Sequence, residues 1–325
     1  MQINYRELPT NRSFGVELEV SKTLSKAGIA DSLRVFEDII NATYKPVVYT
    51  LGVKGWAESR SNDYWHVKYD STCGPLGKHK DHGWEIASYV AQGHQELDSI
   101  SRAVNWLSHA GLETSRNCGF HVHVNAKNLS PRQMGILLAR WIKVEPFLIG
   151  ICDRSRKDNQ YCRSLLMRYW DTGYLYDSES PEEFYLRMRP RNFSSHNNPD
   201  KKYTLNILGY TIYRENGYWD RPTVELRLPE CRLDDIHVKN WTRLFLNFVE
   251  SCQFDTSPPK NLYPVSTIQG VLKCLGLHGK SSFLILDDQL LDTKKWLLQK
   301  ISKSYKLTDN MSDQAAKWLE FISQI

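Results

Sequence analysis

The sequence has no long apolar run. A helix that spans a membrane needs roughly 18 or more consecutive apolar residues, and no such stretch occurs among the 325 residues. The first residues, MQINYRELPTNRSFG, also lack the basic start and apolar core of an export signal. We therefore expect a protein that is neither exported nor embedded in a membrane.

Cysteines are few, and no two of them form a CxxC pair. Their number is seven, an odd count: Cys73, Cys118, Cys152, Cys162, Cys231, Cys252 and Cys274. This pattern argues against a disulfide framework and against a zinc site built from cysteines alone. Reduced thiols in a cytoplasmic protein are the expectation.

A strong charge of either sign is also missing. The chain has 42 basic and 37 acidic residues, a formal net charge of +5. An excess this small and dispersed does not indicate a nucleic-acid or membrane surface, and a small anionic ligand is enough to account for it. The basic stretch RMRPR (187–191) is either a soluble turn or a nucleic-acid contact, and the sequence alone does not separate the two.

No glycine-rich phosphate loop of the Walker type occurs.

What is present is a mixture of strand and helix patterns in a soluble composition, 41% hydrophobic and 24% charged. Strands are predicted at 14–20, 45–51, 65–70, 83–90, 118–126, 204–213 and 221–230. Helices are predicted at 27–43, 93–111, 130–151 and 237–252, with Ser130 and Pro131 as the N-cap and first residue of the third. Beyond about residue 257 three further helices are predicted. We expect one domain over 1–256 and a helical cap or subdomain over 257–325.

Several of the strands alternate an apolar face with a face of Glu, His and Arg. In FGVELEV the carboxylates Glu17 and Glu19 share one face, and in CGFHVHV the imidazoles His121 and His123 do the same. TVELRL repeats the pattern with Glu225 and Arg227, and Glu85 lies in the strand-like stretch GWEIAS. An ordinary solvated sheet face also alternates. Such a face would carry a mixture of Lys, Thr, Ser and Glu, however, whereas these faces carry almost only Glu, His and Arg.

If these strands form one curved antiparallel sheet, their charged side chains converge on its concave face. Four carboxylates placed together repel one another unless cations lie among them. A set rich in carboxylates with a single imidazole suits Mg²⁺ or Mn²⁺ better than zinc. The arginines between 154 and 168 are either a solvated helix face or a clamp for phosphate, and the stretch 188–203 is a candidate mobile loop.

The order of these motifs resembles the amidoligase family, relatives of glutamine synthetase and glutamate–cysteine ligase. The resemblance rests on FGVELEV, DST ahead of GWEIAS, CGFHVHVNA, an arginine- and tyrosine-bearing segment, YTLNI and TVELRL. It covers about residues 12–250 and leaves the C-terminal helices uncovered. It implies an α+β fold with a curved antiparallel sheet of the glutamine synthetase type, flanked by helices, on which metals and arginines hold the nucleotide without a Walker loop.

The resemblance also implies roles for individual residues. The implied metal ligands are Glu17, Glu19, Glu85, His121 and Glu225. His123, Arg154 and Arg227 would contact the nucleotide, and Arg227, Glu225 and Arg163 would act at the transferred phosphoryl group. Asp70 lies in a family-like D-x-T context, but its role is not defined by the resemblance.

The implied activity is an ATP- and Mg²⁺- (or Mn²⁺-) dependent ligase that joins a carboxylate and an amine through an acyl phosphate. The acid and the amine would be amino acids, peptide ends or modified macromolecules. One alternative is a metal-dependent hydrolase that uses the same Glu and His cluster and needs no ATP. A second is a binding protein that has kept the fold and lost the catalytic activity. Such a protein would be expected to lack one of the metal-binding residues.

Overall fold

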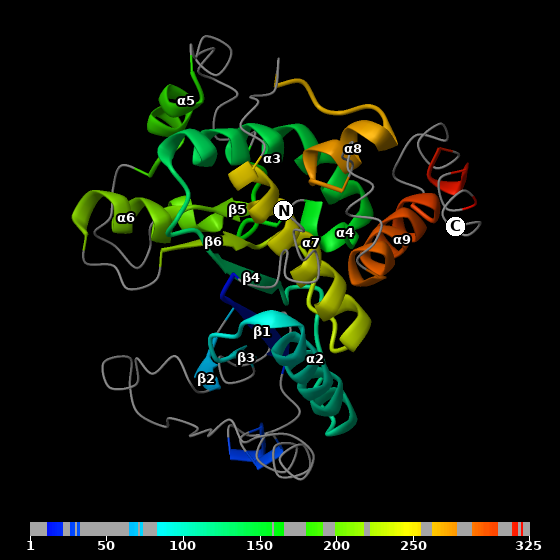
Figure 1. Ribbon diagram of the computed structural model, residues 1–325. Helices are drawn as coiled ribbons and strands as arrows, with labels where there is room; N and C mark the ends of the chain where they lie inside the picture. Colours follow the sequence, from blue (N-terminus) through cyan, green and yellow to red (C-terminus); the bar gives the residue numbers. More distant parts are fainter. Residues whose placement is uncertain are drawn as a thin grey trace. The chain divides into compact units, whose positions relative to one another are not determined.

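A computed structural model of the chain describes residues 12–21, 27–29, 31–32, 65–70, 72–73, 83–157, 159–165, 180–190, 199–217, 222–254, 262–277, 288–304, 314–317 and 320 (Figure 1). The predicted strand at 45–51 lies outside these ranges. So do most of the predicted helix at 27–43 and of the last predicted C-terminal helix, at 312–324, and the central part of the candidate loop, 191–198.

Within the described ranges, six strands form one sheet in the order β2-β3-β1-β4-β6-β5. They are β1 (Phe14–Ser21), β2 (His66–Tyr69), β3 (Gly83–Ala87), β4 (Phe120–Asn125), β5 (Leu205–Asn206) and β6 (Thr223–Leu226). The pairs β1–β3, β2–β3 and β5–β6 are antiparallel. Backbone hydrogen bonds at the two ends of β4, from Phe120 to Pro229 and from Ala126 to Pro222, show that the partner chain segment runs antiparallel there too.

The chain divides into two compact units, which are described separately. Unit 2 comprises residues 10–123 and 229–242, and unit 1 comprises 1–9, 124–228 and 243–325. The strands β1, β2 and β3 lie in unit 2, with the first four residues of β4. The strands β5 and β6 lie in unit 1.

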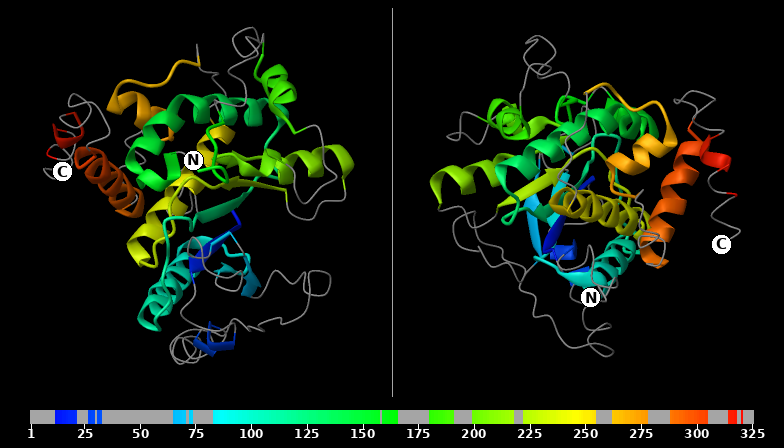
Figure 2. Two further views of the ribbon diagram at one scale, coloured as in Figure 1. Left: turned by 180° about the vertical axis from the view of Figure 1, so that it is seen from behind. Right: turned by 45° about the horizontal axis from the view of Figure 1, so that its top comes forward.

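In unit 2, the alternation of the sequence gives the sheet one apolar face and one polar face. Val67, Ile86 and Leu18 are direct partners across β2, β3 and β1, and all three are buried. The neighbouring row on the opposite face consists of Lys68, Glu85 and Glu19. Helix α2 (Gly93–His109) follows, and its buried stripe matches the helical spacing of the sequence: Leu97, Ile100, Ala103, Val104 and Leu107. It runs beside β1 and β3 in Figures 1 and 2.

Unit 1 is built around helix α3 (Pro131–Ile151). The helix begins at the predicted residues, because the Ser130 side chain accepts from the Gln133 amide and the Gln133 side chain accepts from the Ser130 amide. Helix α5 (Pro181–Met188) packs against it at Gly135, where a Cβ atom would lie 1.8 Å from the carbonyl oxygen of Pro181. Only a glycine allows this approach.

The aromatic core of unit 1 joins α3 to helix α7 (Asp235–Phe254). The Trp141 ring lies 6.4 Å from the Phe245 ring and 5.7 Å from the Phe248 ring, and all three side chains are buried. Helices α8 (Ile268–Cys274) and α9 (Asp288–Ser302) follow, as the sequence predicted. Short helices in the described part of the chain include α4 (Arg154–Lys157) and the 3-10 helix η4 (Pro199–Lys202).

One prediction was wrong. The stretch 204–213 forms only the two-residue strand β5, and helix α6 (Leu208–Asn216) begins immediately after it. The Asn206 side chain accepts from the Leu208 amide at the start of the helix, and Gly217, at φ 70°, ends it. The Thr, Ile and Tyr residues that favoured a strand are overridden by these local signals and by burial of Tyr210 and Thr211 on one helical face.

The fold class and the other strand and helix predictions that fall on described residues hold. The α+β class with an antiparallel sheet flanked by helices is confirmed, as are the strands at β1, β2, β3, β4 and β6. All seven cysteines are buried free thiols. Within the described ranges, no helix has both the length and the apolar character needed to cross a membrane.

Candidate functional site

The polar face of unit 2 carries a row of charged side chains across three strands. Glu19 on β1 lies directly opposite Glu85 on β3, and Glu85 lies directly opposite Lys68 on β2. The Lys68 Nζ atom is 2.8 Å from Oε1 of Glu85. Because opposed residues point to the same side of a sheet, the two glutamates that the sequence singled out share one surface.

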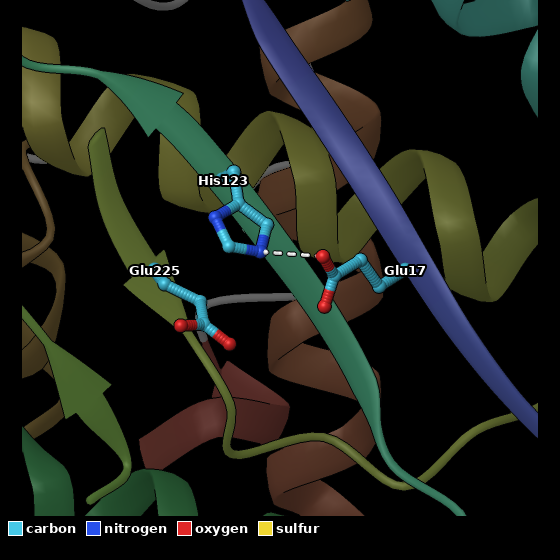
Figure 3. A group of neighbouring side chains, drawn as sticks. All are labelled: Glu17, His123 and Glu225. Carbon is cyan, nitrogen blue, oxygen red and sulfur yellow. Dashed lines mark ion pairs between the residues drawn. The ribbon is translucent and has the colours of Figure 1, made fainter. Parts of the chain in front are cut away.

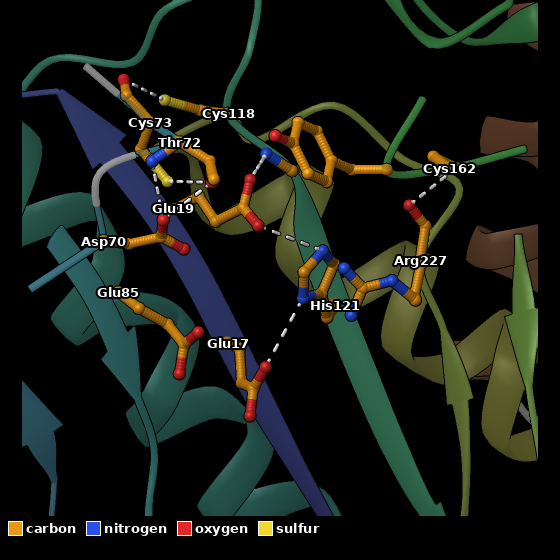
Figure 4. A network of polar contacts seen from close by, with 12 residues as sticks. Glu17, Glu19, Asp70, Thr72, Cys73, Glu85, Cys118, His121, Cys162 and Arg227 are labelled. Atoms are coloured by element: carbon orange, nitrogen blue, oxygen red, sulfur yellow. Dashed lines mark hydrogen bonds and ion pairs between the residues drawn. The ribbon is translucent and has the colours of Figure 1, made fainter. Parts of the chain in front are cut away.

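The histidines of β4 face the glutamates of β1, as the alternation predicted. Nε2 of His123 lies 3.3 Å from one Glu17 oxygen (Figure 3), and Nδ1 of His121 lies 3.4 Å from the other (Figure 4). The second ring nitrogen of His121, Nε2, is 3.5 Å from Oε1 of Glu19. His121 therefore lies between two carboxylates, and Glu17 lies between two imidazoles.

Glu19 is held in place by the backbone of the neighbouring segment. Its amide donates to the Gly119 carbonyl at 3.1 Å, and its Oε2 atom accepts from the Gly119 amide at 2.5 Å. One carboxylate oxygen is thus committed to the main chain, and the other faces His121 (Figure 4). The side chain is only 8% exposed.

The crowding of these groups shifts their acidities in opposite directions. Burial raises the pKa of Glu85 to about 6, helped by the nearby charge of Glu17 and opposed by Lys68. Burial would raise the pKa of Glu17 too. However, the charge of His123 and the hydrogen bonds from His121 and His123 outweigh it and hold that pKa well below its ordinary value. The surroundings therefore keep Glu17 ionised at neutral pH and make the ionised form of Glu85 costly.

Asp70 and Cys73 lie beside Glu19. One oxygen of Asp70 accepts from the amide and the hydroxyl of Thr72, and a ligand atom from each of Glu19, Asp70 and Cys73 lies within 4.8 Å of the other two (Figure 4). The Cys73 thiol is buried, and its hydrogen bond with Cys118 is the main cause of its raised pKa. The D-x-T motif is therefore at the edge of the acidic cluster.

In unit 1, Glu225 and Arg227 form an ion pair on and just after β6. Asn206, the cross-strand partner of Glu225, donates to its Oε2 atom at 2.6 Å. Glu225 is 6% exposed. The sequence predicted that Glu225 and Arg227 share one strand face, and their ion pair confirms it.

The predicted phosphate-facing arginines differ in their surroundings. Arg163 pairs through its main chain with Tyr203, and its guanidinium lies 4.9 Å from the centre of the Tyr203 ring. Arg154, the first residue of α4, is exposed. Between them in the sequence, Arg156 is buried and donates to the main-chain carbonyls of Arg227 and Leu228 at 2.7 and 3.0 Å.

Two residues of this region were missed by sequence reasoning. Lys68 could have been found, because it alternates with Val67 in the same way that Glu17 and Glu19 alternate with Leu18. Arg156 had no such signal. In the sequence it is one of several arginines, and only the structure shows that its guanidinium supports the main chain at Arg227.

Comparison with known proteins identifies the family. Residues 10–249 match the family model described as "Putative amidoligase enzyme". This chain belongs to the amidoligase family. No curated protein matches it. Among solved structures, the amidoligase chain is similar to one titled "Crystal structure of the complex between Prokaryotic Ubiquitin-like Protein Pup and its Ligase PafA", with 11% identity and a TM-score of 0.32. The match covers 99% of this chain and 65% of that one.

Proposed function

We propose that this amidoligase is an ATP-dependent carboxylate–amine ligase. The observation that carries the proposal is the cluster on the polar face of unit 2, where Glu17 and Glu19 flank His121 and lie on the same face as Glu85. Membership of the amidoligase family supports the ligase class. The ATP requirement, the acyl-phosphate route and the individual roles of the residues are the proposal.

The donor set fits a hard divalent cation. Three carboxylates and one imidazole, from Glu17, Glu19, Glu85 and His121, are ligand types that Mg²⁺ and Mn²⁺ accept. The pKa of Glu85 is raised to about 6, because burial and the nearby charge of Glu17 make the ionised carboxylate unfavourable. A bound cation would stabilise the ionised form. By family resemblance, Glu225 is a further ligand. The bound metal would neutralise charge on the phosphate oxygens of ATP.

The proposed chemistry proceeds in two steps. The carboxylate oxygen of the acid substrate attacks the γ-phosphorus of ATP, the bond to the bridging oxygen breaks, and ADP leaves, giving an acyl phosphate. The amine then attacks the acyl carbon, loses a proton and displaces inorganic phosphate. Catalysis of phosphoryl transfer consists mainly of positioning and charge stabilisation. We assign these tasks to Arg227 and Arg163, with Arg154 and His123 contacting the nucleotide.

The substrates are proposed only by class: a carboxylic acid and an amine, each an amino acid, a peptide end or a modified macromolecule. The catalytic region is proposed to span residues 1–256, with 257–325 as a helical cap. The location is proposed to be cytoplasmic.

The test is a screen for ADP release that depends on an added amine. Purified protein is incubated with Mg²⁺ and ATP, and pools of amino acids and amines are added in pairs. ADP that forms only when both an acid and an amine are present supports the ligase. The Glu17→Gln variant should release about 100-fold less ADP or none, because it removes a proposed ligand of the metal that stabilises charge in the transition state. Turnover of a substrate without ATP would favour the hydrolase, and absence of nucleotide binding would favour the binding protein.

A further inference from the structure

A buried carboxylate in unit 1 has no place in the chemistry described so far. Glu145, on α3, is 0% exposed. It accepts four hydrogen bonds: from the Leu165 amide at 2.7 Å, the Ser164 hydroxyl at 2.6 Å, the Trp141 indole at 3.3 Å and the Thr204 hydroxyl. Burying a carboxylate is costly unless donors compensate for the lost water. Four donors from three chain segments indicate that the carboxylate organises this region.

The first segment that Glu145 holds carries Arg163. Its two contacts at Ser164 and Leu165 immediately follow that arginine. Both oxygens of the carboxylate are used: Oε2 binds the Ser164 hydroxyl and Oε1 binds the Leu165 amide. The main chain after Arg163 is therefore fixed to the rigid helix α3.

The second segment is linked to Arg227 through Thr204. The Thr204 side chain donates to Glu145 and also accepts from the Trp141 indole at 3.1 Å. Its amide donates to the Arg163 carbonyl at 2.9 Å, and its own carbonyl accepts from the Arg227 amide at 2.8 Å. Thr204 thus lies between the main chains of the two arginines, and Glu145 fixes its side chain.

We infer that Glu145 is the positioning residue for Arg163 and Arg227, the two arginines assigned to the transferred phosphoryl group. The inference rests on the proposed function for the roles of the arginines. Glu145 itself is too deeply buried to touch a substrate. It acts by fixing the ladder from Arg163 through Thr204 to Arg227. Misplacement of a positioning group by about 1 Å is enough to cost an enzyme roughly 100-fold in rate.

The Glu145→Gln variant separates positioning from simple packing. Glutamine keeps the volume of the side chain but replaces one acceptor oxygen by an NH₂ donor. The glutamine oxygen can take the place of Oε1, which accepts from Leu165, Trp141 and Thr204. Its NH₂ group can take the place of Oε2, because the Ser164 hydroxyl can rotate to accept. The variant is therefore expected to fold, but its hydrogen bonds are no longer assisted by a charge and hold the segments of Arg163 and Arg227 more weakly.

The experiment measures the affinity for AMP-PNP with Mg²⁺ by calorimetry in a double-mutant cycle. In the wild-type background, Glu145→Gln should weaken binding about tenfold, as is common for residues that share one hydrogen-bond network. In the Arg163→Ala background, the same change should weaken it by less than about threefold, because the group being positioned is already missing. Asn247→Asp is the matched control. This equally conservative change removes the donor to the Leu275 carbonyl at 2.8 Å elsewhere in unit 1, and it should lower the melting temperature without changing nucleotide affinity.

Amide hydrogen exchange of the unliganded protein is a second measurement, and it does not depend on the ligase activity. The amides of Thr204 and Arg227 should exchange faster in Glu145→Gln, while those of β1 and β3 should not change. An equal loss of affinity in both backgrounds, or a lower melting temperature with unchanged affinity and exchange, would overturn the inference. If the wild-type protein binds no nucleotide, the proposed function fails. In that case, unchanged exchange at Thr204 and Arg227 would show that Glu145 does not fix these segments either. Faster exchange would support its role in fixing them.

Discussion

Glu19 and Gly119 are joined by two hydrogen bonds, one from each amide. The Glu19 amide donates to the Gly119 carbonyl at 3.1 Å, and the Gly119 amide donates to the Glu19 carboxylate at 2.5 Å. The carboxylate therefore has a structural task through one oxygen and faces His121 with the other. A residue with both tasks allows the two to be separated by mutation.

The first prediction concerns substitutions of Glu19. Glu19→Gln retains an oxygen that can accept from the Gly119 amide, so the free energy of unfolding should change little, while the loss of charge should weaken Mg²⁺ or Mn²⁺ binding. Glu19→Ala leaves the Gly119 amide without this acceptor and should cost about 1–3 kcal/mol of stability as well. Denaturant unfolding and metal titration of both variants give the comparison. Equal stability of the two variants would contradict the structural task, and wild-type metal affinity in Glu19→Gln would contradict its task as a ligand.

The strand pattern was sufficient to predict most of the polar face of unit 2. Alternation has a period of two in any strand, so Glu17 with Glu19, and His121 with His123, had to share a face once the strands formed. That the strands pair in the register which places Glu19 opposite Glu85 is a tertiary property. Neither the pattern nor the family resemblance specified this register; they predicted only that the two carboxylates converge on one face of the sheet.

Other features have a partial signal or none in a single sequence. Helix α6 has local signals at its ends, because the Asn206 side chain accepts from the Leu208 amide and Gly217 ends the helix, but the burial of Tyr210 depends on the surroundings. Glu145 reads as one more acidic residue in a helix. Its four donors come from three segments that are separated by up to 63 residues. Such long-range polar networks depend on the packing that brings the segments together.

The second prediction concerns Gly135, which is needed for the close approach of α3 and α5. Replacing a helical glycine by alanine usually stabilises a protein by about 0.5–1 kcal/mol. At Gly135 the sign should reverse, because the added methyl group would lie 1.8 Å from the Pro181 main-chain oxygen. We expect a loss of about 1–3 kcal/mol, as for other overpacked sites. Gly15→Ala is the control, since its nearest neighbour would be an ordinary 3.7 Å away. Denaturant unfolding that shows a gain in stability for Gly135→Ala would refute the contact.

The third prediction links metal and nucleotide to stability. Crowded carboxylates destabilise the folded state when no cation lies among them. Mg²⁺ or Mn²⁺ with ATP should therefore raise the melting temperature, by the equivalent of about 2.7 kcal/mol when the ligand is present at about 100 times its Kd. Glu17→Gln should abolish most of the shift. Glu182→Gln is the control, because this carboxylate forms a half-exposed pair with Arg132 in unit 1 and should leave the shift intact. A melting curve unchanged by millimolar metal and nucleotide would argue against the site.

The last prediction separates the two histidines of β4. The His121 side chain is 3% exposed and lies between Glu17 and Glu19, whereas the His123 side chain is 27% exposed and forms an ion pair with Glu17. His121→Ala should weaken metal binding and catalysis together. His123→Ala should chiefly impair the use of ATP and should retain metal binding. Calorimetry of metal binding and turnover assays of both variants test the assignment.

A packing control comes from the same strand. Val122, between the two histidines, is fully buried on the apolar face. Val122→Ala should lower the free energy of unfolding by about 1–3 kcal/mol, through loss of buried methyl groups, and should leave the metal affinity of the folded protein nearly unchanged. If the two histidines were ordinary surface residues of a solvated sheet face, both alanine substitutions would change the free energy of unfolding by no more than about 0.5 kcal/mol and would leave metal affinity unchanged. If His121→Ala binds metal as tightly as the wild type, His121 is not a ligand, and the metal-centred chemistry proposed here loses its central group.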